Sequence, residues 1–293
     1  MVKKKSPEPE NAFLKFAPPG HYYSPIPDLA DIEKRKEALF HVPEALPGID
    51  LRVADQLVLF ERFRDFYRHQ PFPETKAANF RYYYDNGWFV YCDGFILHAM
   101  IRHLAPRRLI EIGSGFSSCN ILDTNELFFN HAIHCTFIEP YPQRLYANIK
   151  KEDRHRVKIL EKDIQDVPSD TFAGLAANDI LFIDSTHISR IGSDVNRILF
   201  QILPNLKDGV YIHFHDIFYP FEYPLDWYRQ GRCWNEAYLL RAFLQYNPAF
   251  KIVFFNTYMC RFFPGRFQAD MPLCLKNTGG SLWLKKTGVA GRE

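Results

Sequence analysis

The 293-residue chain carries a formal net charge of +2, with 47% apolar and 16% aromatic residues. This composition allows a substantial hydrophobic core and gives no reason to expect binding to nucleic acid or to an anionic membrane. No apolar run reaches the roughly 18 residues that cross a bilayer, and the basic N-terminus lacks the apolar stretch of a signal peptide. The six cysteines are scattered without a CxxC pair, which favours reduced, mostly buried thiols in a cytoplasmic protein. The composition leaves open whether the chain forms a homo-oligomer.

The first third of the chain differs in composition from the rest. Residues 1–50 are rich in proline and charge, and we expect them to form an extension whose first dozen residues are disordered. Residues 51–104 are expected to form a helical cap. The helices expected in these two parts lie near 31–39, 54–69 and 93–103, and an aromatic loop is expected around 79–88.

Residues 105–288 alternate short apolar runs with helix-like segments, which is typical of a parallel sheet with helices on both faces. In the segment 192–204, the apolar residues follow the i, i+3, i+4 spacing of one helix face. The strands are expected near 108–112, 134–138, 157–160, 179–184, 209–214, 251–256 and 281–285. The clearest helices are expected near 117–127, 142–150, 192–204 and 234–246. The sequence thus predicts an α/β fold.

A glycine-rich turn joins the first of these strands to a helix. Gly113 and Gly115 give the backbone the freedom of a tight turn and let a ligand approach the main chain closely. Ser117 or Ser118 can cap the following helix, whose N-terminal amides face the same ligand. Because Ser118 stands where the dinucleotide-binding fingerprint has its third glycine, the pattern disfavours an NAD site.

Acidic residues follow successive strands and, together with the turn, form a recognisable set. Glu139 ends the second strand, where a carboxylate can accept both hydroxyls of a ribose. The full set is Glu111-Ile-Gly113-Ser-Gly115, Glu139, Asp163-Ile164 and Asp179-Ile-Leu-Phe-Ile-Asp184. Over about residues 89–284 this combination resembles the class I S-adenosylmethionine-dependent methyltransferases. The resemblance implies a Rossmann-like, seven-stranded, mostly parallel sheet whose last strand runs antiparallel, with the N-terminal extension added to it.

The resemblance also implies where S-adenosylmethionine would bind. Its amino group would lie near the acid of the first motif, its carboxylate near the amides of the turn, its ribose near the second acid and its adenine near the third. The cofactor-binding residues implied are Glu111, Gly113, Ser114, Gly115, Ser117, Glu139, Asp163 and Ile164. For Asp163 the alternative of an ordinary surface turn stays open.

Histidine and aspartate residues follow the fourth and fifth strands, as Asp184-x-x-His187 and His213-x-His215-Asp216. Carboxylates and imidazoles at adjacent strand ends can bind a divalent ion. The chain here resembles the magnesium-dependent O-methyltransferases of the catechol and macrolide-sugar types, which implies Asp184, His215 and Asp216 as ligands of magnesium or manganese. A histidine at position 215 departs from the acidic ligands of that family, and it leaves manganese, iron or no metal open.

The same resemblance implies a catalytic role for His187 and Asp184. In the macrolide-sugar enzymes the histidine of the Asp-x-x-His spacing acts as base, so we predict that His187 is the general base. The alternative is that His187 only braces Asp184. His213 is expected to be a buried core histidine bonded to a carboxylate.

The long aromatic, proline-bearing segment 218–228 is interpreted as a substrate lid, with a packing insert or a dimer contact as the alternative. Taken together, the sequence predicts an S-adenosylmethionine-dependent methyltransferase acting on a hydroxyl of a small-molecule or glycan acceptor. The rival functions are a metal-dependent hydrolase using His213-x-His215-Asp216, an NAD-binding oxidoreductase and a non-catalytic binding module on the same fold.

Overall fold

The computed structural model describes residues 12–288 of the chain. The expectation of disorder in the first dozen residues therefore lies outside the described part except at Ala12, which begins a short helix. Within residues 12–288, no helix combines the length and the apolar character needed to cross a membrane. All six cysteines are free thiols and five of them are buried, which confirms the expectation of reduced, mostly buried cysteines.

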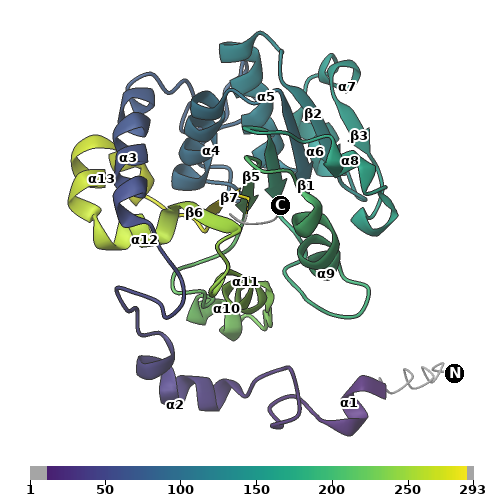
Figure 1. Cartoon of the computed structure of the whole chain (residues 1–293), viewed down its shortest axis with the longest axis vertical. Helices are drawn as coiled ribbons and strands as arrows, with labels where there is room; N and C mark the ends of the chain where they lie inside the picture. The colour runs from purple at the N-terminus through teal and green to yellow at the C-terminus, as the bar shows by residue number, and fades with distance from the viewer. Residues whose placement is uncertain (1–11, 289–293) are drawn as a thin grey trace, which may run out of the picture. The chain divides into compact units, whose positions relative to one another are not determined.

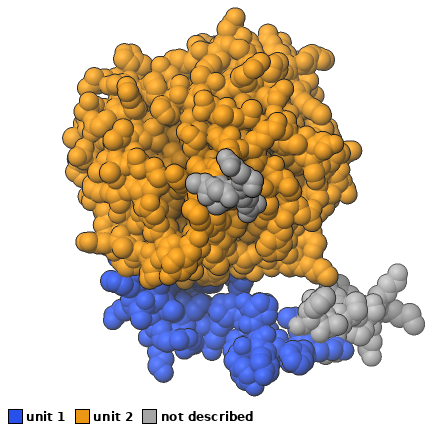
Figure 2. Space-filling view, in the orientation of Figure 1, with its two compact units in different colours: residues 1–42, 223–234 blue, residues 43–222, 235–293 orange. Residues whose placement is uncertain are grey.

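Internal contacts divide the chain into two units, coloured separately in Figure 2. The first comprises residues 1–42 and 223–234, and its helices are α1 (Ala12–Phe16), α2 (Leu29–Leu39) and α10 (Leu225–Arg229). Helix α2 begins at Leu29 because the side chain of Asp28 accepts a hydrogen bond from the amide of Ala30. Within this unit Arg229 forms an ion pair with Glu33.

The second unit, residues 43–222 and 235–293, contains the sheet. The aromatic segment 218–228 is therefore divided between the two units, and its interpretation as a lid stays a prediction. The boundaries that we predicted at residues 50 and 104 also stay predictions.

The sheet has seven strands in the order β3-β2-β1-β4-β5-β7-β6 (Figure 1). The first five strands run parallel, and β7 is antiparallel to both of its neighbours, as expected. Their bounds are β1 (Arg108–Ile112), β2 (His134–Ile138), β3 (Lys158–Leu160), β4 (Ile180–Ile183), β5 (Tyr211–Phe214), β6 (Phe250–Phe255) and β7 (Leu282–Lys286). Each lies where the sequence predicts a strand.

The central strands are buried on both faces. All four residues of β4 are buried, although successive side chains point to opposite faces of the sheet. Both faces are therefore covered, as in α/β proteins generally. The helices of this unit are α3 (Val53–Tyr67), α4 (Tyr91–Leu104), α5 (Phe116–Phe129), α6 (Gln143–Asn148), α7 (Asp153–Arg156), α8 (Asp170–Ala173), α9 (Asp194–Arg197), α11 (Glu236–Leu244), α12 (Asn256–Phe262) and α13 (Pro264–Asp270).

One predicted helix is less regular than expected. The segment 192–204 is not a single α-helix: α9 is followed by a π-helical turn, η2 (Ile198–Ile202), and a 3₁₀ turn, η3 (Leu203–Asn205). Pro204 has no amide hydrogen and cannot continue an α-helical ladder. The apolar stripe on this segment is nonetheless buried, as predicted: Val195, Ile198, Leu199, Ile202 and Leu203. The remaining 3₁₀ turns are η1 (Ile164–Asp166) and η4 (Pro272–Leu275).

This topology determines where a ligand site can form. Strands β2, β1, β4 and β5 are adjacent and parallel, so their carboxyl ends lie along one edge of the sheet. In open α/β sheets ligands bind beyond that edge. Glu139, Asp163, Asp184 and Asp216 follow strands at this edge and Glu111 lies near the end of β1, whereas Asp179 precedes β4 at the opposite edge of the sheet.

Candidate functional site

The glycine turn after β1 depends on a backbone conformation that suits glycine. Gly113 has φ +78°, in the left-handed region that L side chains rarely adopt. Its amide donates to the carbonyl oxygen of Ile138 at 2.9 Å, which joins the turn to the end of β2. Helix α5 then begins at Phe116 with Gly115 at its N-cap.

The expectation that Ser117 or Ser118 caps α5 holds for Ser118, whose hydroxyl forms a capping-box contact with the N-cap residue Gly115, and not for Ser117. Both lie inside the first turn of the helix, because the helix begins one residue earlier than predicted. The hydroxyl of Ser118 accepts a hydrogen bond from the amide of Gly115 at 3.0 Å and donates to Oε2 of Glu111 beneath the turn. Ser117 is buried in the same turn.

Glu111 is fully buried at the end of β1. Burial raises the pKa of its carboxyl to about 8, although hydrogen bonds with Ser117 and Ser118 act in the opposite direction. Its Oε1 has no hydrogen-bond partner among residues 12–288. A carboxyl with one unpartnered oxygen under a glycine turn is suited to receive a cationic group.

Glu139 faces the same turn from the end of β2. Its Oε2 accepts from the amide of Ser114 at 3.1 Å, and its Oε1 accepts from the amide of Tyr141 at 2.8 Å. The carboxylate is therefore held beside the glycine turn, where the sequence predicts the ribose-binding acid.

A cleft of about 480 Å³ opens beside the carboxyl ends of β1, β2, β3 and β4. Five of the predicted cofactor and catalytic residues line it, namely Gly113, Glu139, Asp163, Ile164 and Asp184. The other predicted cofactor residues, Glu111, Ser114, Gly115 and Ser117, lie in and under the turn and do not line it. Sequence reasoning missed the part of the wall formed by Arg190, Gly192, Ser193 and Asp194, which carries no motif.

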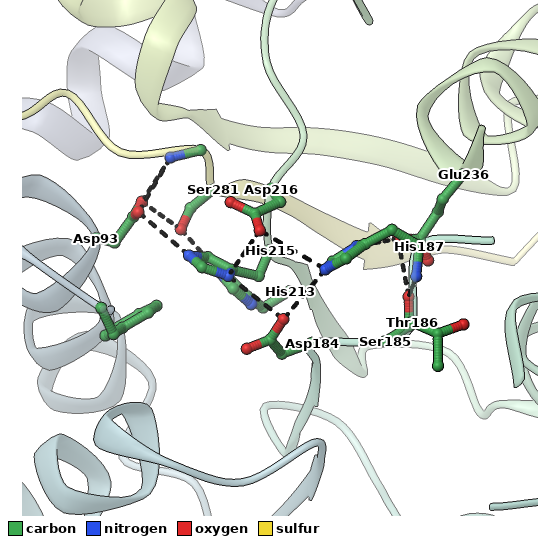
Figure 3. Close-up of polar contacts among 12 residues, drawn as sticks. Asp93, Asp184, Ser185, Thr186, His187, His213, His215, Asp216, Glu236 and Ser281 are labelled. Carbon is green, nitrogen blue, oxygen red and sulfur yellow. Dashed lines mark hydrogen bonds and ion pairs between the residues drawn. The ribbon is translucent and has the colours of Figure 1, made fainter. Parts of the chain in front are cut away.

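The predicted metal and catalytic residues lie together (Figure 3), and one of them, Asp184, also lines the cleft. We call Asp184, His187, His215 and Asp216 the acid–histidine cluster. Nε2 of His187 lies 3.4 Å from Oδ1 of Asp184 and 3.6 Å from Oδ2 of Asp216. Nδ1 of His215 lies 3.4 Å and 3.8 Å from the same two oxygens. One ligand atom each from Asp184, His187 and Asp216 lie within 4.8 Å of one another, a spacing that can hold a metal ion.

Each imidazole of the cluster also faces a second, buried carboxylate. Nδ1 of His187 is 2.8 Å from Oε2 of Glu236, which also accepts from the hydroxyl of Ser185. Nε2 of His215 is 3.4 Å from Oδ2 of Asp93. Glu236 and Asp93 were missed by sequence reasoning, because they lie on helices α11 and α4 and only the fold brings them to the cluster.

The acids raise the pKa of both imidazoles. Burial alone would lower the pKa of His187, but the neighbouring carboxylates of Asp184 and Glu236 outweigh it and raise the pKa to about 10. The pKa of His215 is raised well above its ordinary value, because Asp216 and Asp184 outweigh the effect of burial. The surrounding carboxylates therefore favour the protonated form of both rings.

The backbone of the cluster is strained at two residues. His187 has φ +62° and Asp216 has φ +56°, a region that costs non-glycine residues roughly 1–2 kcal/mol. Strain of this kind persists where the surrounding structure holds it in place, and it concentrates at functional sites. The loops after β4 and β5 therefore hold these two side chains in position at an energetic cost.

His213 is a core residue, as expected. It is fully buried, its ring stacks on Phe182 with centroids 3.9 Å apart, and its Nε2 is 2.8 Å from the hydroxyl of Ser281. The expected partner was a carboxylate, and that detail is wrong: Ser281 stands between His213 and Asp93, to which it donates at 2.6 Å.

A family model described as "Methyltransferase domain" matches residues 110–217, the part of the chain that holds the glycine turn, the acids of the cleft and the whole cluster. The chain belongs to the class I S-adenosylmethionine-dependent methyltransferases. This methyltransferase is 36% identical over 170 residues to an uncharacterized protein of Archaeoglobus fulgidus. The matched region covers 57% of this chain and 76% of the relative.

Solved structures resemble this chain at low sequence identity. The S-adenosylhomocysteine-bound methyltransferase PaMTH1 of Podospora anserina is 16% identical, with a TM-score of 0.43, over 88% of this chain and 95% of that one. The O-methyltransferase TomG of Streptomyces achromogenes, in complex with S-adenosylmethionine, is 15% identical, with a TM-score of 0.42, over 88% and 96%. Similarity at this level says nothing about the acceptor of this methyltransferase.

Proposed function

We propose that this methyltransferase transfers the methyl group of S-adenosylmethionine to a hydroxyl of a small-molecule or glycan acceptor, with a divalent cation at the acid–histidine cluster. One observation carries the proposal: Asp184 lines the cleft that holds the predicted cofactor residues and also belongs to the cluster. Methyl donor and acceptor hydroxyl would therefore meet at one residue, and such alignment is a large part of catalysis.

In this proposal the cleft and the turn bind the cofactor. The free oxygen of Glu111 would meet the amino group, and the amides after Gly113 would hold the carboxylate. Glu139 would exchange its backbone partners for the ribose hydroxyls. Asp163 would accept from the adenine amino group, and the buried Ile164 would pack against the ring.

The residues of the cluster fit a cation. Asp184 and Asp216 offer carboxylate oxygens, and His187 and His215 turn a ring nitrogen toward both of them. Nδ1 of His215 is buried without a hydrogen-bond partner among the described residues, which supports an additional group at this point. A bound divalent cation would lower the pKa of the acceptor hydroxyl.

The general-base role of His187 stays a prediction and receives no support from the contacts. Its Nδ1 bonds to Glu236, and its Nε2 faces Asp184 and Asp216. Both ring nitrogens are therefore directed at carboxylates of the protein rather than at the hydroxyl of a methyl acceptor. These contacts favour the alternative that His187 acts on the cation site itself.

The acceptor class rests on composition and on the cleft. With a net charge of +2 the chain carries no strong charge to attract a nucleic acid or a highly charged protein. Tyr141 lines the cleft and is 75% exposed, and exposed aromatic rings stack on sugars and on aromatic acceptors. Family membership disfavours the hydrolase and the NAD-dependent alternatives.

The test is methyl transfer from radiolabelled S-adenosylmethionine to a panel of catechols, phenols, oligosaccharides, amines and thiols, with and without chelator. We expect transfer to at least one hydroxyl class, loss of transfer in chelator and its return with excess divalent ion. Asp216→Asn should reduce transfer at least tenfold, while Asp65→Asn, on the exposed face of α3, should not. Full activity in chelator would remove the cation from the proposal. Transfer only to amines or thiols would overturn the acceptor class.

A further inference from the structure

We infer that the acid–histidine cluster binds a nitrogen-preferring transition ion, such as zinc, cobalt or iron, and discriminates against magnesium. The inference rests on the proposed function only in placing the cation at this cluster. It concerns which ion the residues of this chain select.

Nitrogen donors are part of the cluster: His187 belongs to the three residues whose ligand atoms lie within 4.8 Å of one another, and Nδ1 of His215 faces the same two carboxylate oxygens. Two imidazoles and two carboxylates face one another in the cluster. Magnesium takes oxygen ligands, keeps several of its waters and needs near-octahedral geometry. Imidazole suits zinc, iron, copper and nickel, and affinity for nitrogen-containing sites rises along the first transition row. Two imidazoles therefore favour a transition ion over magnesium.

The separations across the cluster fit an ion better than direct hydrogen bonds. The four nitrogen–oxygen distances are 3.4, 3.6, 3.4 and 3.8 Å, whereas N–H···O bonds are about 2.7–3.2 Å long. Ligand bonds of about 2.1 Å at a tetrahedral angle separate two donor atoms by about 3.4 Å. On the other side of the His187 ring, Nδ1 lies 2.8 Å from Oε2 of Glu236, within hydrogen-bonding distance. The longer distances occur only where Nε2 faces Asp184 and Asp216.

The outer carboxylates orient both rings for coordination. Glu236 holds Nδ1 of His187, which leaves the lone pair of Nε2 directed at Asp184 and Asp216. Asp93 faces Nε2 of His215, so that its unpartnered Nδ1 is directed at the same carboxylates. Carboxylate–histidine–metal arrangements of this kind recur in metalloproteins.

Asp93 is itself fixed by the fold. It accepts hydrogen bonds from the amide of Gly280, the hydroxyl of Ser281 and the side-chain amide of Asn256. A carboxylate with this many donors cannot turn away from His215 without leaving them unpaired. Asp93 is thus a positioning residue for the imidazole of His215.

The test measures ion selectivity directly on the full chain, after dialysis against chelator and removal of the chelator. Magnesium, manganese, cobalt and zinc are titrated separately by calorimetry, and the cobalt complex is followed by visible absorption. We expect cobalt and zinc to bind at least 100-fold more tightly than magnesium. His187→Ala and His215→Ala should each weaken cobalt binding tenfold or more and alter its spectrum. Asp93→Asn should weaken cobalt binding by roughly 10–100-fold.

Two controls make the result specific. His155→Ala removes an exposed histidine on α7 and should leave cobalt affinity and spectrum unchanged. His215→Asp exchanges a nitrogen donor for an oxygen donor and should narrow the preference for cobalt over magnesium. The relative affinities of the wild-type chain for cobalt, zinc and magnesium are measured without any substitution. They therefore test the inferred ion preference even where a variant fails to fold.

Magnesium affinity equal to that of cobalt, or a cobalt spectrum unchanged in both histidine variants, would overturn the inference. Absence of binding by any of the four ions would also overturn it and would identify the cluster as a hydrogen-bonded network only. S-adenosylmethionine is titrated into the same metal-free chain. If the cofactor binds and no ion is preferred, only the ion inference fails; if the cofactor does not bind, the proposed function fails whatever the ions do.

Discussion

The carbonyl oxygen of Asp184 lies 2.0 Å from the position that a β-carbon on Gly113 would occupy. The glycine turn and the first residue of the acid–histidine cluster are therefore in backbone contact, since the turn after β1 packs against the end of β4. Any side chain at position 113 must displace Asp184 from the cleft and from the cluster together.

Gly113→Ala should therefore be much more damaging than the same substitution at Gly87. Both glycines have φ +78°, but a β-carbon on Gly87 has nothing within 4 Å. Gly87→Ala should cost only the strain of a left-handed residue, about 1–2 kcal/mol. Gly113→Ala should add about 1–3 kcal/mol for the overlap and abolish cofactor binding. Urea unfolding and calorimetry measure both effects, and equal stability losses in the two variants would contradict this packing.

Much of this arrangement could be predicted from the sequence. Short apolar runs gave all seven strands, because buried parallel strands need them. The acids at their carboxyl ends could be grouped without a structure, since parallel strands end at the same edge of the sheet. The glycine turn was recognisable for the same reason, as it sits at the end of the first strand.

Other features depend on contacts that no local pattern contains. Glu236 contacts His187 although the two are 49 residues apart in the sequence. Asp93 contacts His215 from helix α4, a mostly apolar helix whose sequence contains no site motif. Helices α7 and α8 have four residues each, too few to produce a periodicity. The predicted helix at 192–204 loses its regular α-helical form at 198–205, where Pro204 has no amide hydrogen to donate.

Glu111 should make stability fall as pH rises through the neutral range. Its pKa is about 4.5 in the unfolded chain and about 8 in the folded one, because burial disfavours the charged form. Between these values the folded state binds more protons than the unfolded state, so stability decreases with rising pH and levels off above about 8. Unfolding by urea at pH 5, 6.5 and 8 measures the slope. Glu111→Gln should flatten it relative to wild type, and parallel slopes would contradict a buried, neutral Glu111.

Arg81 should be a strong determinant of stability. Its guanidinium donates to the buried carboxylates of Asp153 at 2.6 and 2.7 Å and of Asp123 at 2.6 Å. Arg81→Met would leave both carboxylates buried without a counter-charge and should cost about 3–5 kcal/mol. The control is Arg266→Met, which removes an exposed ion pair with Glu61 and should cost less than about 1 kcal/mol. Comparable losses of unfolding free energy in the two variants would show that the buried ion pairs of Arg81 contribute no more to stability than an exposed pair.

Glu139 should contribute to cofactor affinity. A carboxylate that accepts two ribose hydroxyls contributes on the order of 1.5–3 kcal/mol, so Glu139→Ala should weaken S-adenosylmethionine binding roughly tenfold or more. Because Glu139 also holds the amides of Ser114 and Tyr141, Glu139→Gln serves as the control: it keeps an acceptor for the turn and should bind with intermediate affinity. Calorimetry that gives wild-type affinity for Glu139→Ala would exclude this residue from the site.

The most direct test of the account is a calorimetric titration of S-adenosylhomocysteine into the full chain, with metal-free and metal-loaded protein compared. The account predicts saturable binding of one molecule per chain in both preparations, because the cleft and the glycine turn, rather than the cluster, bind the cofactor. It also predicts that Gly113→Ala abolishes the heat of binding while Gly87→Ala leaves it intact. No saturable binding to folded wild-type protein would contradict the central claim that the cleft beside Gly113, Glu139 and Asp184 is a cofactor site.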